Sequence, residues 1–322
     1  MKILNCLKTL TAAAAISLGF SSCDHKPLCY THPHYAEVRV EFDWSENTSG
    51  TIPEMMSVYA YPRETGGPYV RFDIDAVEGG TIELPVGEWD FLTVNPTSSY
   101  IQFRGHETHS TFEAFTREAN PMEWLSRSSR AIPRAKGAED ENVRIAPDEL
   151  WHQTLRNFRI EEGVHSYSVV FTPTDPLSNY TVEIRNIENL RHVLKISGTI
   201  SGLGESMLLT NRTHMGAPVT MPYPTDKVDE KTVISRFRTF GRHTDAKAHK
   251  IMVYCIMADG KQYYTEADAT QQVVGAPDPR NVHIILDGLD LPKPIEGGSG
   301  LDVDINDWNE IEIDIILPGI ND

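Results

Sequence analysis

The sequence predicts an all-β protein. Apolar and polar residues alternate along many short segments, as in strands with one buried and one solvated face. Turns that contain glycine or proline separate these segments, and no segment has the apolar spacing of a sustained helix. Short strands at such spacing are typical of β-sandwiches and barrels. For a chain of 322 residues, two β-sandwiches in series are the simplest architecture.

The first unit is predicted over residues 35–174. Val38, Val40 and Phe42 alternate with charged residues and mark its first strand. Residues 79–95 predict a hairpin with a Pro-Val-Gly turn, because Pro85 fixes φ at the start of the turn and Gly87 supplies the permissive dihedral inside it. Further strands of this unit are expected at 56–61, 69–74 and 166–171.

The second unit is predicted over residues 175–322. Residues 251–257 are almost all apolar and should form its central buried strand, in which Cys255 would act as a small hydrophobic residue. Residues 233–240 alternate, which places the long stems of Arg236 and Arg238 on an outer face. Further strands are expected at 180–184, 193–200, 262–265, 282–286 and 308–317.

The chain begins with a segment typical of export. An apolar run over residues 9–20 follows two lysines and is too short to cross a ~30 Å hydrocarbon layer as a helix, which takes about 20 residues. Residues 1–22 therefore predict a bacterial signal peptide. Two serines directly before Cys23 have the pattern of a lipobox, so Cys23 is the predicted lipid-attachment site, and its acyl chains would supply the membrane affinity. The alternative is an ordinary secreted protein cut near Ser22.

Residues 23–34 contain two prolines and are predicted to be a tether. A second feature interrupts the first unit, where residues 117–142 break the alternation. Their segment 126–137 is the main basic cluster and is followed at once by three acidic residues. We expect an exposed charged loop here, with a processing site or a partner contact as the alternatives.

The charge of the chain limits its partners. The full sequence has a net charge of −17, and the signal segment removes two lysines and no acid, which leaves −19. Nucleic acid is a poor candidate partner, because its phosphates require a basic surface. Anionic lipid surfaces would also repel the chain, so attachment to a membrane through a lipid is the more natural route.

The sequence predicts no enzyme, no cofactor and no metal site. It lacks the Gly-x-Ser-x-Gly turn, the glycine-rich phosphate loop and the His-Glu-x-x-His motif. His32 and His34 have no further ligand nearby, and residues 302–310 lack the glycine and the final glutamate of a calcium loop. A disulfide between Cys29 and Cys255 is possible in an exported protein, as is a free buried Cys255.

Several segments resemble known proteins. Residues 23–34, the strand end Phe42-Asp43-Trp44 and the turn Leu84-Pro85-Val86-Gly87 resemble a Bacteroidetes lipoprotein family with a domain of unknown function. Residues 303–315 are similar to the last strand of the wider fimbrillin-like group, and residues 194–208 to its second domain. The resemblance implies two tandem transthyretin-like β-sandwich domains and a role near fimbriae, and it transfers one functional residue, Cys23.

The same resemblance bears on the role within a fimbria. Structural fimbrillins polymerise after a protease cuts near the N-terminus behind an arginine, and here no arginine lies between Cys23 and the first strand, since Arg39 is inside it. This favours a fimbrial anchor or accessory subunit that binds other fimbrial subunits while its lipid holds it to the outer membrane. No small-molecule substrate is identified. The alternative is a surface lipoprotein that binds a glycan or another nutrient through Trp89, Trp124 or Trp151.

Overall fold

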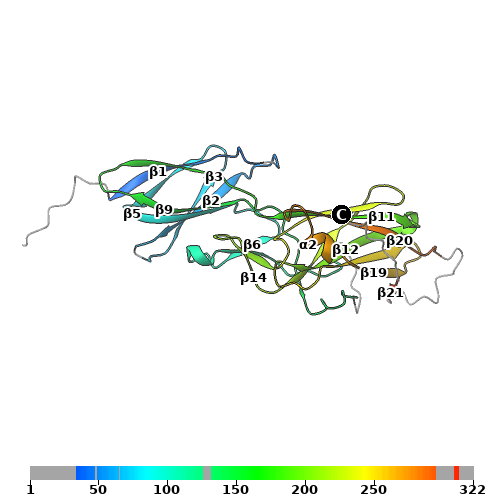
Figure 1. The fold of residues 1–322 in the computed structure, drawn as a ribbon. Helices are drawn as coiled ribbons and strands as arrows, with labels where there is room; N and C mark the ends of the chain where they lie inside the picture. The colour runs from blue at the N-terminus through cyan, green and yellow to red at the C-terminus, as the bar shows by residue number, and fades with distance from the viewer. Residues whose placement is uncertain (1–33, 48, 65, 126–131, 295–307, 312–322) are drawn as a thin grey trace, which may run out of the picture.

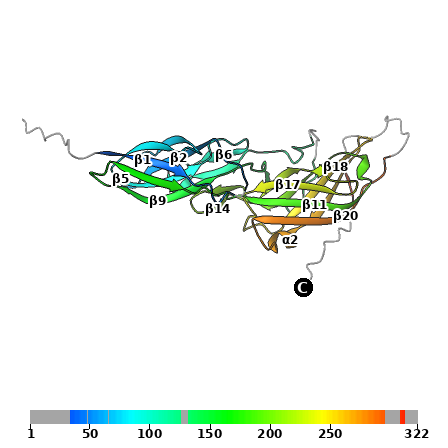
Figure 2. The same ribbon diagram turned by 90° about the horizontal axis from the view of Figure 1, so that it is seen from above.

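The computed structural model describes residues 34–294 and 308–311, apart from 48, 65 and 126–131. The predicted all-β fold is confirmed: the described chain is built from strands, with the helical turns η1 (His109–Thr111) and η2 (Leu190–His192) and the short helix α2 (Thr270–Val274). The molecule is elongated, with β1, β5 and β9 toward one end and β11, β12 and β20 toward the other (Figures 1 and 2).

The first unit contains two sheets that pack face to face. In one sheet, β1 (Tyr35–Phe42) lies between β10 (Ser166–Phe171), which is parallel to it, and β4 (Gly80–Pro85), which is antiparallel. The other sheet has the order β3 (Val70–Asp75), β2 (Met55–Pro62), β5 (Gly87–Val94) and β9 (His152–Ile160). Val38 and Val40 from the first sheet and Phe91 from the second are fully buried in the core between them, which we call the private core.

The predicted hairpin at residues 79–95 is wrong. Both strands exist, but β4 pairs with β1 whereas β5 pairs with β2 and β9, so the chain passes from one sheet to the other. Gly87, at φ 145°, begins the second strand, and the N–H of Val86 donates to the carbonyl of His34. Alternation shows which face of a strand is buried but not which strand lies beside it, and both strands here face the private core from opposite layers.

The second unit also contains two sheets. One has the order β16 (Asp226–Lys227), β17 (Val233–Thr239), β11 (Ser178–Glu188) and β20 (Asn281–Asp290). The other has the order β21 (Trp308–Glu310), β19 (Gln262–Asp268), β18 (Lys250–Met257), β12 (Val193–Leu203), β15 (Val219–Pro224) and β8 (Asn142–Val143). The predicted central strand is confirmed, because β18 lies between β19 and β12 and is buried on both faces. The outward position of Arg236 is confirmed as well, while Arg238 is half-buried.

The segment 117–142 differs from the exposed loop that we expected. Met122, Leu125 and Ala135 are buried against Met252 and Tyr254 of β18. The end of the segment, β8, adds a strand parallel to β15. Apolar residues dispersed among charges thus cover the outer face of the second unit's larger sheet, although the segment lies within the first half of the sequence. Residues 126–131 of the basic cluster lie outside the described residues.

A fifth sheet connects the two units. It has the order β14 (Thr213–Met215), β13 (Ser206–Leu208), β7 (Glu113–Thr116) and β6 (Ile101–Arg104). The β6–β7 hairpin covers the face of β2 and β5 that points away from the private core. The predicted boundary between residues 174 and 175 stays a prediction, and contacts cross it in several places.

Candidate functional site at the junction of the two units

In the fifth sheet, backbone hydrogen bonds join a strand of the first unit to a strand of the second. β7 from the first half pairs antiparallel with β13 from the second, with Phe115 opposite Ser206 and Glu113 opposite Leu208. Such pairing fixes both distance and orientation, because a slip of one residue would turn every side chain to the opposite face.

An ion pair lies at the centre of this sheet. Arg104 donates two hydrogen bonds to the nearly buried Glu113, at 2.6 and 2.8 Å, and Ser206 donates a third from the other unit. Burial opposes ionisation of Glu113, but the hydrogen bonds from Arg104 and Ser206 outweigh it and lower the pKa of this carboxyl group. The charge of Glu113 is therefore satisfied from both halves of the chain.

Apolar packing follows the same path. Tyr59 and Phe112 from the first unit belong to one continuous core with Ile200, Leu203 and Phe240 of the second, which we call the shared core. The rings of Phe112 and Tyr59 meet edge to face, with 4.8 Å between their centroids. Because all five residues are almost completely buried, the shared core couples the two units energetically.

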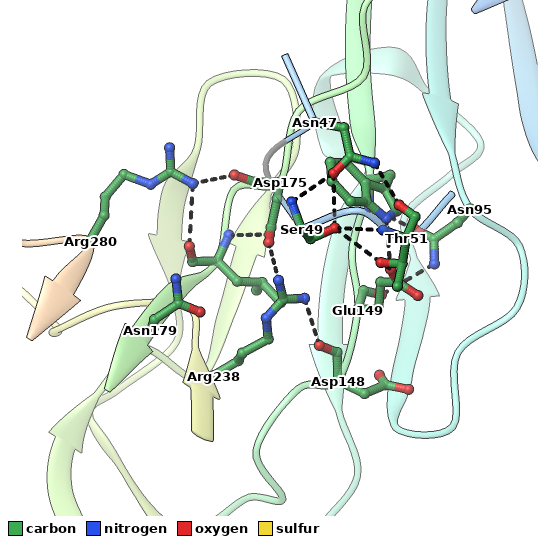
Figure 3. Close-up of polar contacts among 12 residues, drawn as sticks. Asn47, Ser49, Thr51, Asn95, Asp148, Glu149, Asp175, Asn179, Arg238 and Arg280 are labelled. Atoms are coloured by element: carbon green, nitrogen blue, oxygen red, sulfur yellow. Dashed lines mark hydrogen bonds and ion pairs between the residues drawn. The ribbon is translucent and has the colours of Figure 1, made fainter. Parts of the chain in front are cut away.

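A polar cluster occupies the other side of the junction, where residue 175 leads into the second unit (Figure 3). Arg238 of β17 forms an ion pair with Asp175 and donates to the carbonyl of Asp148 at 2.9 Å, so it joins three chain segments. Burial raises the pKa of Asp175, and the N–H of Leu177 and the charge of Arg238 offset part of that rise.

The neighbouring loop is fixed by Glu149. Its Oε1 accepts hydrogen bonds from Thr51 and from the indole N–H of Trp151, both at 2.9 Å. The buried Asn95 accepts from the N–H of Trp151 and donates to the carbonyl of Glu149. Figure 3 shows these side chains converging on one point between the loop after β1 and the start of β9. Buried polar groups that are paired in this way rigidify the junction.

In the part of the chain that the structure describes, no group of three or more His, Cys, Asp or Glu residues could hold a metal ion. Within the same residues, no helix is long and apolar enough to cross a bilayer.

The residues predicted from the sequence lie elsewhere. Cys23, Cys29 and His32 lie outside the described residues, and His34 is exposed. Cys255 is a free thiol and is 2% exposed, and burial raises its pKa to about 12. The thiol is therefore neutral, as expected for a cysteine that acts as a small hydrophobic residue of the core. The calcium alternative at 302–310 falls mostly outside the described residues, although 308–310 form β21.

The three candidate tryptophans are not equally placed. Trp89 and Trp151 are only 5% and 3% exposed and pack in the interior, whereas Trp124 is half-buried. The two buried rings cannot stack on a sugar without rearrangement. No sequence motif marked the junction, because its residues come from six or more separate segments.

Comparison with known proteins places the chain in a family. The model of a domain of unknown function, DUF5119, matches residues 22–224, which is more than half of the chain. The chain belongs to this family. The resemblance to a Bacteroidetes family with a domain of unknown function is thereby confirmed, and the DUF5119 match includes the first unit, the fifth sheet and the strands through β15.

Two relatives extend the comparison over most of the chain. A Bacteroides ovatus protein named as the fimbrium anchoring subunit Fim4B is 20% identical, over 94% of this chain and 95% of its own. The crystal structure of a protein described as an adhesin, also from Bacteroides ovatus, has a TM-score of 0.62 at 20% identity and covers 81% of this chain and 93% of its own. This DUF5119 protein therefore shares its fold with that structure.

A third protein is a named fimbrial component. The fimbrial anchor protein Mfa2 of Porphyromonas gingivalis aligns with a TM-score of 0.46 at 13% identity, over 79% of this chain and 90% of its own.

Proposed function

We propose that this protein is an outer-membrane lipoprotein, held by acyl chains on Cys23, that acts as a fimbrial anchor, accessory or adhesion subunit through contacts with other fimbrial subunits. The observation that carries the proposal is the similarity to the named fimbrium anchoring subunit over nearly the full length of both chains. The proposal includes two tandem transthyretin-like β-sandwich domains, at 35–174 and 175–322.

The structure of the described residues supports such a role. An anchor must transmit force between the membrane and the fibre, and here the two units are joined by a shared sheet, a shared core and a polar cluster. The N–H of Val86, just after β4, donates a hydrogen bond to the carbonyl of His34, so the start of β1 lies where the chain crosses from β4 to β5. The loop after the other end of β1 reaches the junction. The first described residue, His34, therefore lies at the end of the molecule far from the second unit (Figure 2).

Membrane attachment is tested by replacing the proposed acylation site. The Cys23→Ala variant should leave the membrane fraction and lose labelling by a palmitate analogue, whereas the matched Cys29→Ala variant should keep both. Retention of Cys23→Ala in the detergent-soluble membrane fraction would refute lipid attachment at this residue. The same fractions, probed after surface proteolysis of intact cells, would show which face of the outer membrane the protein occupies.

The fimbrial role has its own test. Affinity capture of the tagged full chain from its native cells should retain fimbrial subunits. Binding to a glycan array, without any fimbrial subunit in the captured material, would favour the nutrient-binding alternative. The buried positions of Trp89 and Trp151 count against that alternative.

A further inference from the structure

A groove runs across the junction, beside the polar cluster of Figure 3. A cavity of about 520 Å³ lies between the start of β9, residues 172–174 and the β13–β14 turn, and it adjoins a second cavity of about 530 Å³ toward β11 and β20. The two cavities share Glu46 and Thr174, and we call them together the junction groove. Hydroxyl and amide groups dominate the wall of the first cavity.

The groove contains a buried histidine with no hydrogen-bond partner. His152 is 3% exposed and lines the first cavity, and neither of its ring nitrogens bonds to any described residue. Its backbone pairs with Thr174 in both directions, which fixes the ring at this place. Burial, together with the positive charge of Arg212, lowers the pKa of His152 to about 3, so the imidazole is neutral and offers one N–H donor and one acceptor. Buried polar groups are normally satisfied, so a buried ring without a partner makes this cavity a candidate binding site.

Arg212 lies on the opposite wall in an unusual conformation. Its φ of 57° is in the left-handed region, which glycine and asparagine adopt at lower cost. The guanidinium donates to the hydroxyl of Thr174 at 2.7 Å, and no described carboxylate lies within 4.0 Å of it. Residues in sparsely populated backbone conformations cluster at functional sites, so Arg212 is a candidate binding residue of the groove.

Arg280 supplies a second unpaired guanidinium. It donates to the backbone carbonyls of Asp175 and Leu177 (Figure 3), and it too has no described carboxylate within 4.0 Å. Its charge contributes to lowering the pKa of Arg212, so the two guanidiniums repel each other across the groove. Three carboxylates, Glu46, Asp175 and Asp278, also line the groove, so the positive charge that an anion would stabilise is confined to the two guanidiniums that have no ion pair.

We propose that the junction groove binds a carboxylate group of an acidic peptide segment from a partner protein, with Arg212 as the principal donor. A carboxylate fits better than a phosphate, since the strongly acidic chain repels a dianion more than a monoanion. A peptide fits a groove of two adjoining cavities, which could take the carboxylate in the first and the neighbouring backbone in the second. The identity of the partner, but not the chemistry of the groove, rests on the proposed function.

Of the three carboxylates that line the groove, Glu46 opposes this binding most directly, because Asp175 pairs with Arg238 and Asp278 accepts hydrogen bonds from Asn281 and from the N–H of Arg280. Glu46 is exposed, lines both cavities and has no described cation within 4.0 Å. Its charge would repel an acidic ligand, so the Glu46→Gln variant should bind that ligand more tightly. This gain of affinity provides a test in which loss of folding cannot imitate the expected result.

The experiment uses the full chain in detergent and a capped peptide, Gly-Ser-Glu-Ser-Gly, with its Gln counterpart as the matched ligand. Calorimetry should show saturable binding of the Glu peptide and binding of the Gln peptide that is weaker by about tenfold or more. Arg212→Gln should lose a similar factor, and Arg212→Lys should lose part of it, because lysine keeps the charge but not the planar fork. Arg191→Gln, which removes the same charge near the opposite end of β11, should bind as the unaltered chain does.

Three outcomes would overturn the inference. Equal binding of the Glu and Gln peptides would exclude carboxylate recognition, and an unchanged affinity in Arg212→Lys and Glu46→Gln would exclude these residues. Acetate or inorganic phosphate that binds as tightly as the peptide would exclude a peptide partner. If Arg212→Gln still captures fimbrial subunits as well as the unaltered chain does, the groove is not their binding site, while the proposed fimbrial function stands.

Discussion

The two faces of the sheet β3–β2–β5–β9 meet different cores. One face, with Val58 and Phe91, packs against β1, β4 and β10 in the private core, which involves residues of the first unit alone. The other face, with Tyr59 and Leu92, packs under the β6–β7 hairpin and belongs to the shared core that extends through the second unit. We therefore expect the part of the molecule around the private core to be stable by itself and the part around the shared core to depend on both units. The following experiments test that difference, from the largest expected effect to the smallest.

Cutting the chain at the predicted boundary should have the largest effect. A fragment of residues 175–322 lacks β6, β7, β8 and the segment with Met122 and Leu125, and so loses two strands of the fifth sheet, one strand of the larger sheet and the cover of β18. We expect this fragment to show no cooperative urea transition, whereas a fragment of residues 35–174 should keep one through its private core. Circular dichroism during urea titration measures both. A cooperative transition of the 175–322 fragment would show that the second unit does not depend on the shared core.

Two phenylalanine substitutions compare the cores directly. Phe91→Ala and Phe112→Ala each remove a fully buried ring, which costs about 3–5 kcal/mol of unfolding free energy. Phe112→Ala should speed hydrogen exchange in both units, because Phe112 belongs to the shared core. Phe91→Ala should speed exchange mainly in β1, β4, β5 and β10. Mass spectrometry of exchanged peptides gives the readout, and identical patterns for the two variants would remove the distinction between the cores.

The ion pair at the junction should contribute a smaller, pH-dependent amount. Glu113→Gln leaves Arg104 without its carboxylate, and because Arg104 is half exposed we expect a cost of about 1–2 kcal/mol. The pKa of Glu113 is lowered from 4.5, so its contribution is present above that value and is lost as pH falls from there through the lower folded pKa. The difference in stability between Glu113→Gln and the unaltered chain should therefore shrink on acidification from pH 6 toward pH 3.

Asp73→Asn is the matched control for this measurement. Asp73 also accepts hydrogen bonds from an arginine and a serine, but it lies on the surface of the first unit, and its side chain is 40% exposed. Urea titrations at several pH values should give a smaller cost for this variant than for Glu113→Gln. The reverse order would mean that the junction pair is no more important than a surface pair.

The sequence predicted strands well because alternation is a local property. β1, β2, β10 and β17 lie where alternating residues placed them, and the apolar run 251–257 became the buried β18. Strand partners are not local. Nothing in the sequence near Glu113 indicates that β7 pairs with residues 206–208, and the same limit explains the wrong hairpin at 79–95.

The junction groove could not be predicted for a related reason. His152 and Arg212 are isolated residues in segments 60 positions apart, and their relation arises only when β9 and the β13–β14 turn meet. The one local signal was the sequence Leu209-Thr210-Asn211-Arg212 before a strand, which indicates a turn but not a charged residue with positive φ. Cys23, by contrast, was marked by its local motif, and it lies outside the described residues.

The parallel pairing of β1 with β10 has a mechanical consequence. Both strands run toward the junction and share a register of six residue pairs, from Glu37 opposite Ser166 to Phe42 opposite Phe171. Tension that pulls the start of β1 away from the second unit acts along the strands, in shear. All the hydrogen bonds between the two strands then carry the force together, instead of breaking one after another from one end. The first unit is thus shaped to resist rupture along the axis of the molecule, whatever its equilibrium stability.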